Sequence, residues 1–150
     1  MQNVSYHSCG SWTHKLDPKN RIAIPGDWRP SDDTPLLLLS SSREGLPTIK
    51  VYTQQCFLQI VEQIKASDFS FAAKDAYIGR MYANSVECLV NSQGKLLVPK
   101  NLAEHAKIES LVKIASRGEY FELWEPTLFE EAEEKTRLST IDINNMFAIF

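Results

Sequence analysis

Two stretches of the chain decide the fold, Asp17-Pro18-Lys19-Asn20-Arg21-Ile22-Ala23-Ile24-Pro25 and Asn91-Ser92-Gln93-Gly94-Lys95-Leu96-Leu97-Val98-Pro99. They lie 74 residues apart, and each runs from Asp or Asn to a basic residue and then through three apolar residues to a proline. A second match, at an offset of 72 residues, aligns Ile49–Thr53 with Phe121–Glu125. Because similarity at a fixed spacing indicates repeated units, we interpret the chain as two copies of a unit of about 70 residues.

Each repeated stretch predicts a tight turn followed by a strand. Pro18 presets the φ angle of the second turn position, and Asn20 tolerates a positive φ. Gly94 takes the place of Asn20 in the second copy, which supports a left-handed backbone at this position. We expect residues 12–17 and 21–24 to form the two strands of a hairpin, so that the basic residue lies at the hairpin tip.

The remainder of each copy predicts a second hairpin and a helix. Alternating apolar residues around a turn glycine give hairpins over residues 36–52 and 111–124. Helices then begin at Thr53, which can cap free backbone N–H groups, and at Pro126, which suits the first helical position. Four aromatic residues at equivalent repeat positions are expected in the core: Tyr52, Phe57, Trp124 and Phe129.

A further helix over residues 68–81, capped by Asp68, is predicted to join the two copies. A unit of this size alone buries a small fraction of its surface, so two tandem copies are expected to share one core. The predicted fold class is therefore α+β. The chain divides into a first unit at 6–65, a helical linker at 66–81, a second unit at 82–138 and a C-terminal tail at 139–150.

Composition is that of a folded soluble protein. Of the 150 residues, 43% are hydrophobic and 23% are charged, which is unlike a disordered acidic chain. The longest apolar run, Leu36–Leu39, is far shorter than the roughly 18–20 residues of a membrane-spanning helix. The N-terminus lacks the basic and apolar regions of a secretory signal. We therefore expect a cytoplasmic protein without a membrane partner.

The net charge of −3 conceals an uneven distribution. Residues 119–150 hold eight acidic and two basic side chains, whereas residues 1–118 hold 14 basic and 11 acidic ones. The acidic end fits an exposed helix face, and most of the chain is mildly basic. An acidic average therefore does not exclude a local basic surface that binds nucleic acid.

The sequence contains no motif of a common catalytic or cofactor site. A phosphate loop, a nucleophile elbow and a dinucleotide fingerprint are all missing from it. The three cysteines form no CxxC pair, and His7, Cys9 and His14 fit no zinc template; Cys56 and Cys88 lie in apolar patterns that favour burial. We expect no enzyme, cofactor or metal, although distance along the chain does not exclude a site assembled in space.

The two predicted hairpin tips carry the functional signal. The first is basic through Lys15, Lys19 and Arg21, and the second carries Lys95. Such ribbons can clamp phosphates or enter a major groove, and the planar fork of Arg21 can bind a phosphate or a guanine edge bidentately. Asp17 could orient that fork. The alternative is that Asp17 and Arg21 form only a structural salt bridge and that Lys19 is a solvated turn residue.

The repeated residues resemble a known family. The first stretch is similar to the D-x-K-G-R-ϕ-x-ϕ-P signature of MraZ proteins, and the stretch that begins at Asn91 resembles its second copy. Phe121-Glu122-Leu123-Trp124 is similar to the F-E-L/I-W segment near the end of that family, and Gly10 matches an N-terminal glycine. The likeness covers roughly residues 6–138, and the order and spacing of the three segments make it specific.

The resemblance implies two SpoVT-AbrB-like units that form an intramolecular pseudo-dimer with swapped β-hairpins. It implies a ring-shaped homo-oligomer that binds repeated boxes in double-stranded DNA upstream of the bacterial division and cell-wall gene cluster and regulates its transcription. A nucleoid-associated protein without a small-molecule substrate would follow. The family's DNA-facing arginine falls on Arg21; by position Asp17, Lys19, Asn91 and Lys95 follow, and Lys15 joins them on charge.

The chain departs from the family pattern at three positions. Asn20 replaces a glycine, Asn91 replaces an aspartate and Lys95 replaces an arginine. Lysine keeps the charge but lacks the bidentate fork, so the second loop is expected to bind phosphate without reading bases, or not to bind. The alternative function is an AbrB-like scaffold or protein-interaction module without DNA binding, in which the acidic last helix and the apolar tail at 141–150 carry the contacts.

Overall fold

The computed structural model describes residues 8–31 and 33–150, so the interpretation of His7 lies outside the described part. The elements are β1 (Ser11–Lys15), β2 (Arg21–Ala23), η1 (Gly26–Trp28), β3 (Leu36–Arg43), β4 (Leu46–Thr53), α1 (Gln54–Lys65), α2 (Phe71–Ala83), β5 (Ser85–Cys88), β6 (Lys95–Leu97), α3 (Lys100–His105), β7 (Leu111–Ser116), β8 (Tyr120–Trp124), α4 (Pro126–Ser139) and α5 (Ile141–Phe147). This mixture of helices and antiparallel strands confirms the α+β class.

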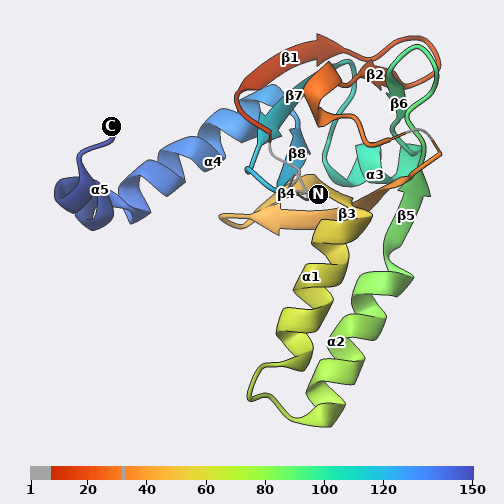
Figure 1. The fold of residues 1–150 in the computed structure, drawn as a ribbon. Coiled ribbons are helices and arrows are strands. Elements are labelled where there is room, and N and C mark those ends of the chain that lie inside the picture. Colours follow the sequence, from red (N-terminus) through yellow and green to blue (C-terminus); the bar gives the residue numbers. More distant parts are fainter. Residues whose placement is uncertain (1–7, 32) are drawn as a thin grey trace, which may run out of the picture.

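The strands form two antiparallel sheets that interlace the two copies (Figure 1). The large sheet has the order β1-β7-β8-β4-β3-β5, and the small one pairs β2 with β6. The predicted hairpins β3–β4 and β7–β8 both form. The two edge strands of the large sheet each pair with a strand of the other copy. β1 of the first copy pairs with β7 of the second, and β5 of the second copy pairs with β3 of the first. The sheets are therefore built jointly by both halves of the chain.

The pairing of β2 corrects one prediction. The turn after Asp17 forms, but β2 pairs with β6 of the second copy and not with β1. Ile22 lies opposite Leu96, and both side chains are buried. This pairing encloses Ile22 and Ile24 of the first stretch and Leu96 and Val98 of the second in one core. β1, most of whose residues are exposed, pairs with β7 at the edge of the large sheet.

One large core and one smaller cluster hold these elements together. The large core contains Trp28 and Leu102, which occupy equivalent repeat positions, packed with buried residues from both sheets. Three of the four aromatic residues expected in the core are buried, and Phe129 is half-buried beside Trp124 at 6.2 Å between ring centroids. Cys56 is buried, as predicted, and Cys88 is half-buried.

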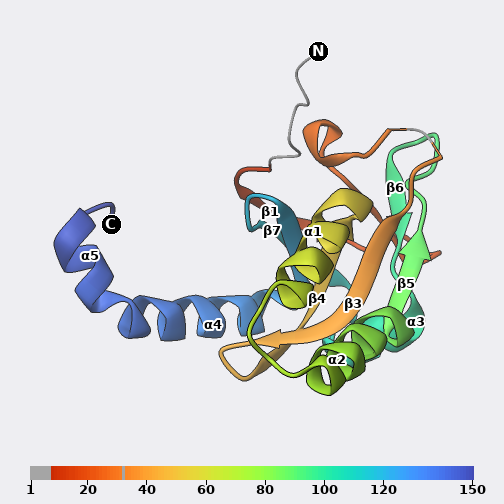
Figure 2. The same ribbon diagram turned by 60° about the horizontal axis from the view of Figure 1, so that its bottom comes forward.

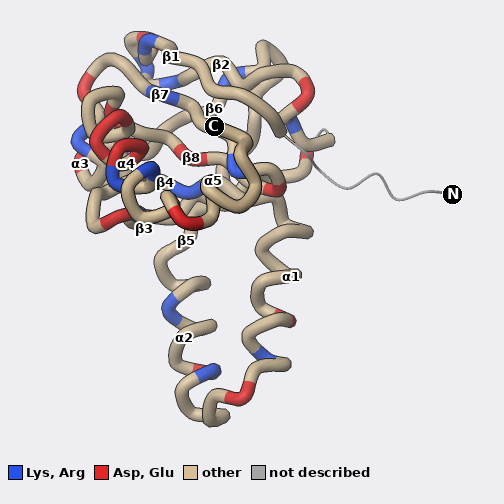
Figure 3. The backbone as a smooth tube through the Cα atoms, turned by 90° about the vertical axis from the view of Figure 1, so that its left-hand side faces the viewer, with Lys and Arg blue, Asp and Glu red and all other residues tan. Residues whose placement is uncertain are grey.

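Helices α1 and α2 form a hairpin that projects from the large sheet (Figures 1 and 3). Thr53 caps α1 as predicted, because its hydroxyl accepts a hydrogen bond from the backbone N–H of Cys56 at 3.1 Å. The cap of α2 is Ser70 and not the predicted Asp68, because the Ser70 hydroxyl accepts a hydrogen bond from the backbone N–H of Ala73. Asp68 lies in the turn between α1 and α2. α2 contains no buried residue among those described, so its apolar side chains are largely open to solvent.

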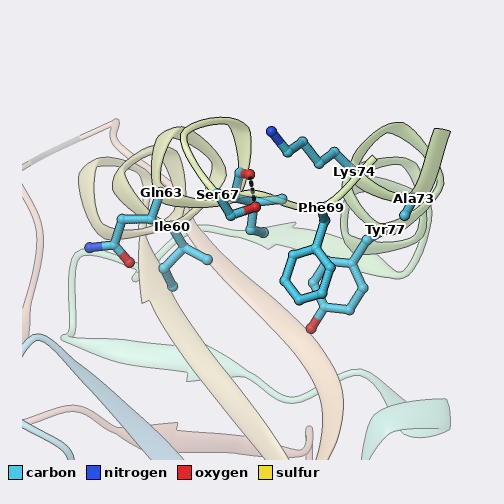
Figure 4. A pocket seen from close by; sticks show the side chains of 8 residues that line it. Ile60, Gln63, Ser67, Phe69, Ala73, Lys74 and Tyr77 are labelled. Carbon is cyan, nitrogen blue, oxygen red and sulfur yellow. Dashed lines mark hydrogen bonds between the residues drawn. The ribbon is translucent and has the colours of Figure 1, made fainter. Parts of the chain in front are cut away.

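An apolar groove lies between the two helices of this hairpin (Figure 4). Its volume is about 540 Å³. Ile60 and Ile64 line it from α1, and Phe69, Ala73 and Tyr77 line it from the loop and α2. Phe69 is 73% exposed, so this apolar surface is not covered by the rest of the described chain.

Helices α4 and α5 form an arm that extends away from the sheets (Figures 1 and 2). Arg43 ties the arm to the sheet, because it donates to buried Glu122 at 3.2 Å, to Thr136 at 2.9 Å and to Glu133 at 3.2 Å. Beyond this point the arm is exposed, and its acidic residues face solvent as expected. No helix among residues 8–31 and 33–150 has the length and apolar character needed to cross a membrane.

Candidate nucleic-acid interface

The first loop is a tight turn organised by the carboxylate of Asp17. Its Oδ1 accepts hydrogen bonds from the backbone N–H of Lys19 at 2.8 Å and of Arg21 at 2.9 Å. The N–H of Asn20 donates to the Asp17 carbonyl at 2.9 Å, and Asn20 has a φ of 58°. Asparagine tolerates this left-handed conformation better than most residues, which explains why it can stand where the family has glycine.

The second oxygen of Asp17 holds cationic side chains. Its Oδ2 accepts a hydrogen bond from Nε of Arg21 at 2.8 Å, and Nζ of Lys95 lies 3.7 Å away. Burial alone would raise the pKa of Asp17, but the hydrogen bonds from Arg21 and Lys19 and the charge of Arg21 outweigh it and lower the pKa from 3.8 to about 2. Asp17 therefore stays ionised and fixes the direction of the Arg21 fork.

The second loop repeats this turn without the charge. Oδ1 of Asn91 accepts from the N–H of Gln93 at 3.0 Å and of Lys95 at 2.9 Å. The N–H of Gly94 donates to the Asn91 carbonyl at 2.9 Å, and Gly94 has a φ of 76°. Asn91 thus preserves the turn that Asp17 makes, but its neutral amide cannot form an ion pair with Lys95.

The β2–β6 pair brings the two loops together. Ala23 lies opposite Lys95, and Arg21 lies opposite Leu97. The pairing continues into both loops, because the N–H of Ile24 donates to the Gly94 carbonyl and the N–H of Val98 donates to the Asn20 carbonyl, each at 2.9 Å. The predicted pair of separate tips is therefore one continuous surface.

The residues that the sequence predicts for DNA binding lie at different distances from one another in the structure. Asp17, Arg21 and Lys95 meet directly through the ion pairs described above. Lys15 and Lys19 are exposed, at the end of β1 and in the turn. In Figure 3, basic segments lie around β1, β2 and β7, at the end of the molecule opposite the tip of the α1–α2 hairpin. Among the residues that the structure describes, no cluster of His, Cys, Asp and Glu could hold a metal ion.

Arg29 is a basic residue of this surface that the sequence analysis missed. It is exposed, it follows η1, and its Nε donates to the Ile24 carbonyl at 2.8 Å. The guanidinium lies directly on Gly94, where any Cβ atom would overlap it. Ala103 occupies the equivalent position in the second copy, so a comparison of the two copies could have singled out Arg29 as a feature of one copy alone.

Comparison with known proteins agrees with the repeated motifs. The family model described as "MraZ protein, putative antitoxin-like" matches residues 81–146. A "Transcriptional regulator MraZ" from Heliobacterium modesticaldum is 31% identical over 127 residues, which cover 84% of this chain and 86% of the relative. The chain belongs to the MraZ family. This confirms the resemblance on which the sequence analysis relied.

Other MraZ relatives match over a similar length. The "Transcriptional regulator MraZ" proteins of Caldanaerobacter subterraneus subsp. tengcongensis and Thermoanaerobacter sp. are each 30% identical over 135 residues, or 89% of this chain and 92% of the relative. Alignments of this length include both repeated loops of an MraZ chain and are not confined to one copy.

Proposed function

We propose that this chain is a DNA-binding transcriptional regulator that contacts double-stranded DNA through its two paired loops. The single observation that carries the proposal is the joining of the loops by β2 and β6, which places the half-buried side chains of Arg21 and Lys95 around one carboxylate. A rigid pair of cationic loops suits phosphate neutralisation, which dominates protein–DNA affinity. The names of the relatives support a regulatory role.

The residues of the surface have different roles in this proposal. Arg21 is the principal contact, because Asp17 holds its Nε and leaves the remaining N–H groups of the fork for a ligand. Lys15, Lys19 and Lys95 neutralise phosphates as point charges. Asn91 shapes the second loop and leaves the charge of Lys95 without a second acidic partner in that loop.

The proposal includes a homo-oligomer, because two large apolar surfaces of one chain lie exposed. One is the groove between α1 and α2, and the other is the tail, where Phe147 is 66% and Met146 is 78% exposed. Two different surfaces that bind each other make a head-to-tail contact, which closes into a ring when the rotation per subunit allows. The rim of the groove carries Lys74, and the tail follows the acidic helix α4, so their charges are complementary.

A ring suits DNA with repeated boxes, because many weak contacts act together. Linked contacts raise avidity by about 10²–10⁴ over one contact. In line with the resemblance, we propose that the two interlaced units act as an AbrB-like pseudo-dimer. The targets would be boxes upstream of the division and cell-wall gene cluster, and the protein would be associated with the nucleoid.

Replacing Arg21 tests the DNA-binding proposal. Arg21→Ala removes the one oriented fork of the first loop, so the affinity for tandem repeats from upstream of the protein's own operon should fall by at least about tenfold. Losing a phosphate contact should also lower the slope of log affinity against log salt by about one per subunit. A gel-shift series at several salt concentrations measures both quantities.

Arg80→Ala is the matched control, because Arg80 is an exposed arginine on α2 away from both loops. It should bind like the unmodified protein, and light scattering should give all three proteins the same mass. Unchanged affinity of Arg21→Ala would overturn the role of Arg21. If the unmodified protein shows no salt-sensitive DNA retention at low ionic strength, the scaffold alternative replaces the proposed function.

A further inference from the structure

Arg29 crosses from the first copy onto the loop of the second. The residue follows η1 in the first copy, yet its guanidinium rests on Gly94, which belongs to the second loop. The small sheet makes this possible, because Ile24 bonds to Gly94 through its N–H while its carbonyl accepts from Nε of Arg29. Ile24, which directly follows β2, therefore connects the second loop to the Arg29 side chain through its two backbone hydrogen bonds.

The contact fixes the direction of the Arg29 fork. The hydrogen bond to the Ile24 carbonyl uses Nε, which leaves both terminal nitrogens for a ligand. Among residues 8–31 and 33–150, Arg29 makes no ion pair. Gly94 is needed beneath it for two reasons, because its φ is positive and because a Cβ atom would occupy the space of the guanidinium.

We propose that Arg29 contacts DNA and supplies the second loop with the bidentate fork that Lys95 lacks. This inference rests on the proposed DNA-binding function. The proposed contact surface is built by both copies. The second copy contributes the turn at Gly94 and the point charge of Lys95, and the first copy contributes the planar guanidinium of Arg29. The ligand group is a pair of adjacent acceptors on DNA, either phosphate oxygens or the O6 and N7 atoms of guanine.

The geometry favours a functional contact over a purely structural one. The Arg29 guanidinium is held by a hydrogen bond to the Ile24 carbonyl and lies against Gly94, so it loses little further rotamer freedom when it binds, which raises affinity. The first loop has the same arrangement, because Asp17 holds Nε of Arg21 and leaves the terminal nitrogens of the guanidinium for a ligand. Each loop thus carries one arginine tethered through its Nε atom.

Two variants of Arg29 test the inference on two DNA probes. Arg29→Ala removes the fork, and Arg29→Lys keeps the charge but cannot bind bidentately. Gel shifts use the tandem upstream repeats and a scrambled duplex of equal length, with Arg80→Ala as the control. We expect Arg29→Ala to weaken binding to the repeats by at least about tenfold, with Arg29→Lys restoring only part of the loss.

The two probes separate the possible acceptors. An equal loss on both duplexes identifies a phosphate contact, and a loss confined to the repeats identifies a base-edge contact; either outcome supports the proposal. Thermal unfolding checks that the variants remain folded. If Arg29→Ala binds the repeats within twofold of the unmodified protein while Arg21→Ala does not bind, Arg29 is not a DNA contact although the proposed function stands. If the unmodified protein binds neither duplex, both proposals fail.

Discussion

Asp17 and Asn91 make the same turn with different charges. Both side chains accept two backbone N–H groups through Oδ1, but only Asp17 pairs with arginine and lysine side chains through Oδ2. The second loop therefore shows that an asparagine at this position makes the same turn as an aspartate. The negative charge of Asp17 serves the cations around it and is not required for the backbone conformation.

This difference predicts a pH dependence for Asp17→Asn. The pKa of Asp17 is about 2 in the folded protein, below its ordinary value of 3.8, so its ionised form stabilises the native state above about pH 4. That stabilisation disappears as the pH falls from about 4 to about 2, because the carboxylate becomes protonated in both states. The stability difference between the unmodified protein and Asp17→Asn should therefore shrink across this window in urea unfolding.

Asn91→Ser is a control for that measurement, because its side chain carries no titrating charge. Its stability relative to the unmodified protein should not depend on pH across the same window. A constant difference for Asp17→Asn between pH 5 and pH 2 would contradict the assignment of the ion pairs.

At the scale of elements, the Arg43–Glu122 contact attaches α4 to the large sheet. Glu122 is fully buried, and Arg43 is its cationic partner with a side chain only 11% exposed. Trp124 donates its Nε1–H to the same carboxylate oxygen at 3.0 Å, and the Arg43 guanidinium lies 5.2 Å from the Trp124 ring centroid. Oε2 of Glu122 has no hydrogen-bond partner among the described residues, so the carboxylate depends heavily on Arg43.

Arg43→Met should therefore be strongly destabilising. Removing one partner leaves a buried charge uncompensated, which costs about 3–5 kcal/mol. Adding Glu122→Gln should recover part of this loss, because the neutral amide can keep the bond from Trp124. Urea unfolding measures both changes. Lys135→Met, which breaks only an exposed pair with Glu131, should change stability by less than about 1 kcal/mol.

The sequence predicted local features of these elements better than their partners. The positive φ at Asn20 and Gly94, the cap at Thr53 and the two hairpins all depend on residues close together in the chain. The β2–β6 pair could not be deduced this way, because alternation of apolar residues does not identify which strand lies alongside. The position of Arg29 depends on that pair, which explains why the sequence analysis missed it.

At the scale of the whole molecule, substitutions in the exposed tail test the proposed homo-oligomer. Phe147 and Ile149 are exposed apolar residues of the arm, and burying each in a neighbouring subunit would contribute about 1.5–3 kcal/mol. The double variant Phe147→Ser, Ile149→Ser should therefore reduce the mass measured by light scattering after size exclusion. Its DNA affinity should fall by about 10²–10⁴ as avidity is lost.

Asn145→Ser on α5 is the matched control, because it changes an exposed polar residue of the same helix. It should leave both the mass and the affinity unchanged. A double variant with the mass of the unmodified oligomer would exclude the tail as its interface, and a monomeric unmodified protein would rule out the oligomer itself.

The centre of the large sheet shows what joining the two copies in one chain permits. Lys50 lies directly opposite Glu122, at equivalent positions of the two copies. In a symmetric dimer of two identical chains, this pair would have to be two lysines or two glutamates, and like charges directly opposite each other destabilise a sheet. A single chain changes one side without changing the other. Within one chain, equivalent positions of the two copies can carry different residues, and the Lys50–Glu122 pair, the Asp17–Asn91 difference and Arg29 are three examples.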